Sequence, residues 1–225
     1  MEAKNNTFSG LLRRIGSWFR SRFSVPRGEV REMALDGLLR RNPLLVLLLG
    51  LCPALGAATS LQNGIAMGAA TAVVLVCSSL TCALLRPVIP AQIFPAVRLI
   101  AAAAFTGAID LLMQALLPGL SQALGIYIPL IAVSGVVLCR GTAAGLLPGR
   151  AALDTLFSGA GFTAALAVLG GARELLGAGT IWGHPLPLIS SHPLRILLSP
   201  CGGFLLLGAL TALVQFIKRR KGGAA

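Results

Sequence analysis

Long apolar runs separated by short polar connections fill the chain after residue 41. A helix that crosses the hydrocarbon core of a bilayer needs about 20 predominantly apolar residues, bounded by charge, proline or glycine. Six runs of this order follow one another, and each predicts a membrane-crossing helix. They cover residues 42–60, 64–85, 97–117, 126–138, 156–176 and 194–217. The fourth run is short and continues into a Gly-rich, Pro-containing stretch, so we expect that helix to be broken.

The composition supports a membrane protein. Hydrophobic residues make up 56% of the 225 residues and charged residues 12%, and the mean hydropathy is +0.84. These values lie outside the usual range of soluble domains. The net charge of +12 would normally suggest a nucleic-acid partner, but the basic residues lie at the ends of apolar runs and in the N-terminal segment. We therefore predict contact with a membrane and not with nucleic acid.

Lysine and arginine predict the orientation, because short loops rich in these residues are retained in the cytoplasm. Nine precede residue 42, two lie in the second-to-third connection, two in the fourth-to-fifth, and four follow residue 217. The opposite side holds only Arg173 and Arg195. This asymmetry predicts six crossings with both termini in the cytoplasm.

Three parts make up the predicted domain organisation. Residues 1–41 form a basic arm in which apolar residues recur at steps of three and four, a pattern typical of an amphipathic helix on the inner leaflet. A partly disordered arm is the alternative. Residues 42–217 form the six-helix membrane domain, and residues 218–225 form a basic cytoplasmic tail.

Three crossings in each half require the second half to be inverted relative to the first. Inverted repeats in transporter-like folds place interrupted helices near the membrane midplane, around the functional site. The first and fourth segments correspond, and each carries proline, glycine and one cysteine: Cys52 in NPLLVLLLGLCPALGAAT and Cys139 in GIYIPLIAVSGVVLCRG. We predict an all-α membrane fold of two inverted three-helix repeats, with the first and fourth helices broken.

Five motifs, taken in order, make the chain resemble a known family. They are NPLLVLLLGLCPALGAAT, VCSSLT, LGIYIPLI, AALDTLFSGAG and ARELLGAGTI, and the resemblance covers nearly everything after the arm. Each motif is weak alone, but the ordered set is specific. It resembles the E subunit of the Rnf ion-translocating electron-transport complex and its relatives in the sodium-translocating NADH:quinone reductase.

The resemblance implies a subunit, without activity of its own, of a redox-driven ion translocase in the bacterial inner membrane. It implies a sister A-type subunit of opposite topology and other Rnf-type subunits carrying flavin and iron–sulfur centres. Electrons would flow between ferredoxin and NAD, coupled to sodium or proton movement. Each of the two sister subunits would give two cysteines to one intramembrane [2Fe-2S] cluster, through which electrons cross the membrane.

Cys52 falls on the family's first ligand position, and four cysteine thiolates hold such a cluster. An inert buried thiol is the alternative. The family's second cysteine lies six residues after Pro129, where this chain has Gly135, and Cys139 follows four residues later. Four residues advance about 6 Å along a helix. Either the broken fourth helix shifts so that Cys139 is the second ligand, or the cluster is lost or altered.

Three charged residues associated with the apolar runs need an explanation: Asp110, Arg173 and Glu174. Asp110 lies near the middle of the third run. Ionisable groups within a membrane mark ion or proton pathways, so Asp110 is a possible ion or proton site, with a hydrogen-bonded interhelical contact as the alternative. Arg173 and Glu174 lie near the outer end of the fifth run, and we expect an interfacial pair or a headgroup contact there.

Motifs for independent catalysis are absent from the sequence. No GxGxxG or P-loop follows a predicted strand, and no serine elbow or HExxH occurs. Two functions remain: an electron-conducting subunit that works only within its complex, and a non-redox membrane transporter or scaffold subunit of the same inverted-repeat fold. Iron content separates them.

Overall fold

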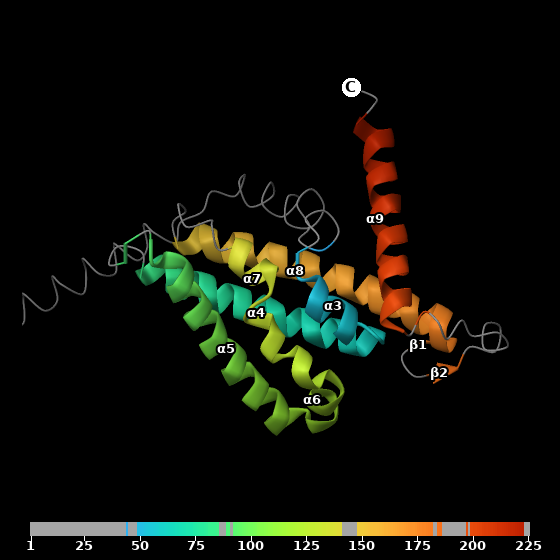
Figure 1. The fold of residues 1–225 in the computed structure, drawn as a ribbon, viewed down its shortest axis with the longest axis horizontal. Helices are drawn as coiled ribbons and strands as arrows, with labels where there is room; N and C mark the ends of the chain where they lie inside the picture. Colours follow the sequence, from blue (N-terminus) through green and yellow to red (C-terminus); the bar gives the residue numbers. More distant parts are fainter. Residues whose placement is uncertain are drawn as a thin grey trace, which may run out of the picture.

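The computed structural model describes residues 44, 49–85, 89–90, 92–140, 148–181, 184–185, 197 and 199–222. These residues are almost entirely helical (Figure 1). The helices are α3 (Leu51–Ala57), α4 (Leu61–Leu85), α5 (Phe94–Leu116), α6 (Pro118–Leu124), α7 (Gly135–Arg140), α8 (Pro148–Arg173) and α9 (Pro200–Gly222). Short helical turns form η2 (Gly125–Tyr127), η3 (Pro129–Ile131) and η4 (Glu174–Ala178), and strands β1 (Thr180–Ile181) and β2 (His184–Pro185) pair antiparallel. The predicted basic arm lies outside the described residues.

Three helices of the described chain are long and apolar enough to cross a membrane: α4, α5, and α8 extended by η4 over Gly149–Ala178. A fourth span is possible as a bent pair, because Pro118–Tyr127 and Pro129–Cys139 meet at 44°. Helix α9 contains a shorter apolar stretch, Pro200–Phe216. The all-α class is therefore confirmed, together with several candidate membrane spans. The six crossings and the inverted repeat stay predictions.

Helices α3 and α7 are short because the backbone before each is interrupted. Gly50 precedes α3 with a φ of +77°, a left-handed conformation that glycine adopts without steric cost. Before α7, helical structure stops at residues 132–134, after η3. The two interruptions lie in the first and fourth apolar runs, and they place the start of a new helix at Leu51 and at Gly135.

The centre of the fold is the pair α4 and α8, which lie side by side and antiparallel (Figure 1). Glycines allow their backbones to approach closely. A Cβ added to Gly64 would lie 2.7 Å from the carbonyl oxygen of Leu166, and one added to Gly68 would lie 2.6 Å from Cα of Thr163. Small residues of this kind are typical of helix pairs in membranes, where association depends on close packing and not on the hydrophobic effect.

The apolar core lies between α4, α8 and the broken segments. Its buried members include Met67, Val74, Leu75, Ile128, Ile131, Val136, Phe162, Leu166 and Leu169. Helix α5 lies at the edge of this core, since only 11% of its apolar window is buried, against 39% for α4 and 44% for α8 with η4. Helix α9 leaves the end of α8 at a steep angle and buries little of its apolar surface (Figure 1). Much of the apolar surface of α5 and α9 is therefore exposed.

Candidate functional site

The two broken segments meet at the starts of α3 and α7. A Cβ added to Gly135 would lie 3.0 Å from Cδ2 of Leu49, and one added to Gly50 would lie 2.7 Å from Cγ2 of Val136. Cys52 is the second residue of α3 and therefore follows this contact directly along the chain. Its side chain lies outside the described atoms. Gly135 and Val136, the first two residues of α7, and Phe162 of α8 lie beside the start of α3.

Cys139 lies at the other end of α7, as the residue before its last. Its side chain is exposed. One helical turn, about 6 Å, separates it from Gly135. The structure thus brings Gly135 against the α3 start and leaves Cys139 on the surface, within reach of a neighbouring protein.

The side chains of the described residues can be compared with the ligands that a [2Fe-2S] cluster needs. Such a cluster needs four ligands, usually thiolates. No group of three or more His, Cys, Asp or Glu side chains within the described part of the chain could hold a metal ion. The side chain of Cys52 lies outside that part of the chain, so the ligand pair Cys52 and Cys139 stays a prediction.

Asp110 lies in the second half of α5 and is half-buried. One of its carboxylate oxygens accepts a hydrogen bond from Nε2 of Gln114 at 3.1 Å. Because Gln114 is one turn further along the same helix, this bond differs from the interhelical contact that was the alternative. The ion or proton site at Asp110 stays a prediction.

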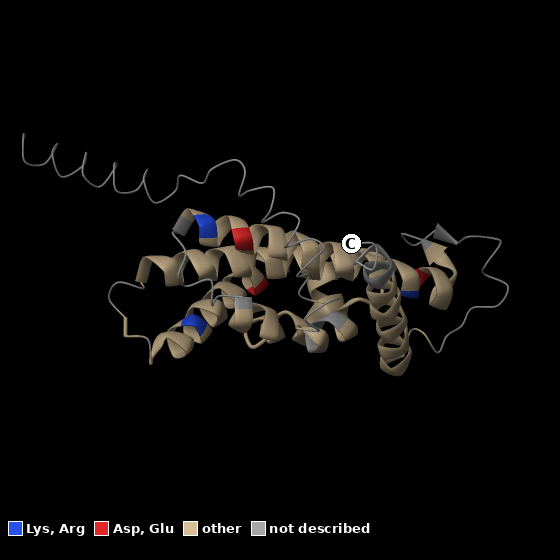
Figure 2. Ribbon diagram, turned by 90° about the horizontal axis from the view of Figure 1, so that it is seen from above, with Lys and Arg blue, Asp and Glu red and all other residues tan. Residues whose placement is uncertain are grey.

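Arg173 and Glu174 are buried, with exposed fractions of 1% and 6%, so the expected headgroup contact is wrong. Charged residues are few along the described chain (Figure 2), so two adjacent buried ones need an explanation. Within the described part of the chain, the guanidinium of Arg173 donates four hydrogen bonds to backbone carbonyl oxygens. Nη1 donates to Leu55 at 2.7 Å and to Ala58 at 3.1 Å, Nε to Leu197 at 3.0 Å, and Nη2 to Ser199 at 3.1 Å.

These bonds join three helices at one point. Leu55 lies in the last turn of α3 and Ser199 immediately before α9, so Arg173 ties both to the end of α8. Gly203 makes room for it, because a Cβ there would lie 3.0 Å from Cζ of the guanidinium. Carbonyls at a helix C-terminus lack partners within the helix, and a cation there also interacts favourably with the helix dipole. Arg173 satisfies this requirement for α3.

Glu174 performs the complementary task at the start of α4. Its Oε2 accepts a hydrogen bond from the backbone N–H of Leu61 at 2.8 Å, and its Oε1 accepts one from Oγ1 of Thr180 at 3.4 Å. Leu61 is the first residue of α4, where backbone N–H groups lack helical acceptors and negative charge is favoured. Arg173 and Glu174 thus hold the two ends of the connection between α3 and α4. Helix α3 carries Cys52, so these two residues also help to hold that helix in place.

Comparison with known protein families shows which family the chain belongs to. Residues 30–211 match the family described as "Rnf-Nqr subunit, membrane protein". The chain belongs to the Rnf-Nqr family. The resemblance predicted from the five ordered motifs is confirmed, and so is a membrane protein with several apolar helices.

Among curated proteins of the Rnf-Nqr family, this chain is similar to E subunits. It is 42% identical over 182 residues to the E subunit of the Na(+)-translocating ferredoxin:NAD(+) oxidoreductase complex of Acetobacterium woodii, covering 80% of this chain and 93% of that protein. It is 44% identical over 199 residues to the E subunit of the ion-translocating oxidoreductase complex of Pseudomonas paraeruginosa, covering 82% and 83%. The protein of the same description from Pseudoalteromonas atlantica is 37% identical over 207 residues, covering 85% and 89%. These relatives are parts of multi-subunit complexes.

Proposed function

We propose that this chain is the E-type membrane subunit of a Rnf-type complex that couples electron transfer between ferredoxin and NAD to movement of sodium ions or protons. The similarity to the Acetobacterium woodii protein, which extends over 93% of that relative, supports this most strongly. The chain has no activity of its own in this proposal. It works in the bacterial inner membrane, beside subunits that carry flavin and iron–sulfur centres.

The proposed architecture is six membrane helices in two inverted three-helix repeats, with both termini in the cytoplasm. The antiparallel pair α4 and α8 supports it, since these helices are the second of each proposed repeat and both contribute glycines to their contact. The short helices α3 and α7 support it as well. Each follows an interruption of the backbone, at Gly50 and at residues 132–134, and each comes before the long helix of its repeat.

In this proposal Cys52 and Cys139 supply this chain's thiolates to a [2Fe-2S] cluster shared with a sister A-type subunit of opposite topology. When bound, the cluster would carry one electron at a time across the membrane. The exposure of Cys139 supports a ligand directed at another subunit. This chain's own contribution is positional, because Arg173 ties the C-terminal end of α3 to α8 and Glu174 holds the start of α4. Asp110, half-buried in α5, is the proposed ion or proton site.

Removal of this chain from its complex tests the function. Membranes of cells that lack it should lose NAD reduction driven by reduced ferredoxin, and expression of the wild-type chain should restore it. An affinity tag on the chain should recover the sister subunit and the subunits with flavin and iron–sulfur centres. Full ferredoxin-dependent activity in membranes without the chain would favour the alternative, a non-redox transporter or scaffold subunit.

The shifted position of Cys139 gives a separate prediction. Cys139→Ser should remove the cluster's electron paramagnetic resonance signal, because a serine hydroxyl is a poor ligand for iron. The double variant Gly135→Cys with Cys139→Ser should restore part of the signal, since the tightest contact of a Cβ added at residue 135 is with the movable end of Leu49, at 3.0 Å. Cys201→Ser is the matched control, because Cys201 is also exposed at a helix end. An unchanged signal in Cys139→Ser would remove this residue from the ligand set.

A further inference from the structure

Arg98 is a buried cation near the start of α5, with an exposed fraction of 5%. Nη1 of its guanidinium donates a hydrogen bond to the backbone carbonyl of Leu138 at 2.9 Å, and Cζ lies 5.1 Å from the centre of the Phe94 ring. Leu138 is the third residue from the end of α7 and comes immediately before Cys139. The guanidinium therefore joins the start of α5 to the part of α7 that carries Cys139.

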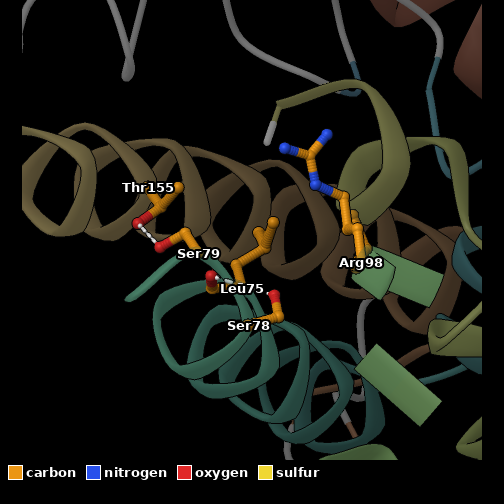
Figure 3. A pocket seen from close by; sticks show the side chains of 6 residues that line it. Leu75, Ser78, Ser79, Arg98 and Thr155 are labelled. Carbon is orange, nitrogen blue, oxygen red and sulfur yellow. Dashed lines mark hydrogen bonds between the residues drawn. The ribbon is translucent and has the colours of Figure 1, made fainter. Parts of the chain in front are cut away.

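The surroundings of Arg98 offer its other nitrogens no acceptor within the described part of the chain. Nε and Nη2 are buried there without a hydrogen-bond partner. The adjoining space is mostly apolar and does not admit a water molecule, and Figure 3 shows Ser79 and Thr155 on its lining bonded to each other, at 3.0 Å, and not to Arg98. Burial of a cation with so few partners costs free energy. The bond to Leu138 is therefore the contact that a role for Arg98 has to explain.

The end of α7 needs a contact of this kind. The helix has only six residues, far fewer than a helix needs to be stable by itself. The last four carbonyls of a helix find no donor within it, and the carbonyl of Leu138 is one of these. A cation at this end also interacts favourably with the helix dipole, and a charged donor makes a stronger hydrogen bond than a neutral one. Arg98 thus satisfies a carbonyl and keeps the last turn of α7 from fraying.

Arg173 makes the equivalent contact with α3. Each of the two buried arginines donates to a carbonyl near the C-terminal end of a short helix, Arg173 to Leu55 of α3 and Arg98 to Leu138 of α7. The guanidinium of Arg173 lies beside Gly203 near the start of α9, as Arg98 lies near the start of α5. In the proposed repeats, α3 and α7 are the first helices and α5 and α9 the third. Each first helix therefore ends at an arginine guanidinium that lies beside the third helix of the other repeat.

We propose that Arg98 is a positioning residue for Cys139. Its bond to Leu138 fixes the last turn of α7, and with it the exposed thiol that this chain offers to the shared cluster. The inference rests on the proposed function, because it takes Cys139 as a cluster ligand. Arg98 acts through the backbone of α7 and does not contact the cluster. The bond also explains how a ligand can lie one turn beyond Gly135, because Cys139 directly follows the carbonyl that Arg98 holds.

Hydrogen exchange in the isolated full-length chain tests the contact without any cluster. In detergent, Arg98→Gln should speed amide exchange across residues 135–140 about tenfold or more, because the end of α7 loses its donor. Arg98→Met, which replaces the buried charge by an apolar side chain of similar length, should do the same and carries the test if Arg98→Gln does not fold. Arg98→Lys should stay within about threefold of wild type, since lysine keeps a charged donor. Peptides from α4 should exchange as in wild type, and Arg220→Gln, which removes one charge from the basic tail, is the control.

The second arm uses the complex, purified by a tag on this chain and reduced with dithionite. In Arg98→Gln the electron paramagnetic resonance signal of the cluster should broaden or lose about half of its intensity or more, because one thiolate is no longer held in place. Arg98→Lys should restore the signal. The other subunits should co-purify at the wild-type level in both variants, since Arg98 is buried within this chain.

The two arms separate this inference from the proposed function. Unchanged exchange across residues 135–140 in Arg98→Gln and Arg98→Met would overturn the inference, whatever the complex contains. Faster exchange with an unchanged cluster signal would mean that Arg98 holds α7 but does not position Cys139, and failure of both variants to fold would assign Arg98 to stability alone; either result would also overturn it. A wild-type complex without a cluster signal would instead contradict the proposed function, while exchange in the isolated chain would still show whether Arg98 holds the end of α7.

Discussion

Replacement of Arg173 by glutamine should lower the free energy of unfolding by about 3–5 kcal/mol, because it leaves buried backbone carbonyls without donors. The guanidinium donates hydrogen bonds to two carbonyls at the end of α3, those of Leu55 and Ala58, and to two carbonyls that precede α9. A glutamine amide is too short to reach both pairs of carbonyls. Thermal unfolding of the purified chain in detergent measures the change. Val168→Ala, at an exposed position of the same helix, is the control and should stay close to wild type.

Lysine at residue 173 separates charge from geometry. Arg173→Lys keeps the positive charge but has three donors on a single nitrogen, so it should satisfy one of the two carbonyl groups and lose less stability than Arg173→Gln. Wild-type stability in Arg173→Gln would show that the bonds from α8 to α3 and α9 do not hold the fold together. The structural role assigned to this residue would then be wrong.

Cys52→Ser should reduce ferredoxin-dependent NAD reduction by membranes at least about 100-fold, because the proposed cluster loses a thiolate that serine does not replace. The chain should still assemble, since the substitution exchanges one atom of similar size on α3. Activity in isolated membranes, measured together with the amount of chain present, gives the result. The control is Cys77→Ser on α4, whose half-buried thiol lies outside the proposed site.

Assembly separates the two meanings of a loss of activity in Cys52→Ser. If the variant complex contains all subunits but transfers no electrons, Cys52 acts in electron transfer. If the subunits no longer co-purify, the thiol is a packing residue of α3. Normal activity in Cys52→Ser would be incompatible with its proposed role as a ligand.

Apolar run length predicts the long helices well, because lipid imposes the same requirement on every residue of a crossing. The run 64–85 corresponds to α4 (Leu61–Leu85), and the run 97–117 to α5 (Phe94–Leu116). Helix α8 begins at Pro148, eight residues before the apolar run 156–176. Arg150 and Asp154 ended that run in the sequence, but both are part of the helix and have partners in the structure.

The contacts of the buried charges could not be predicted from the sequence. Arg173 binds carbonyls of Leu55 and Ala58, which are more than 100 positions away, and every residue has a carbonyl, so no side-chain pattern identifies the acceptor. The ARELL motif drew attention to Arg173 and Glu174 but did not indicate that both are buried within the protein. Arg98 gave no signal at all, because it looked like one more basic residue at the end of an apolar run. Its hydrogen bond to the backbone carbonyl of Leu138 appears only once α7 is placed beside α5.

Iron in the purified complex decides whether this chain conducts electrons as part of a Rnf-type assembly. The measurement is iron content and the electron paramagnetic resonance spectrum of the chain co-purified with its sister subunit and reduced with dithionite. We expect about two iron atoms per pair and a [2Fe-2S] signal that is lost in Cys52→Ser. A wild-type pair that assembles without iron would rule out electron conduction through such a cluster, and a transporter or scaffold role on the same fold would replace it.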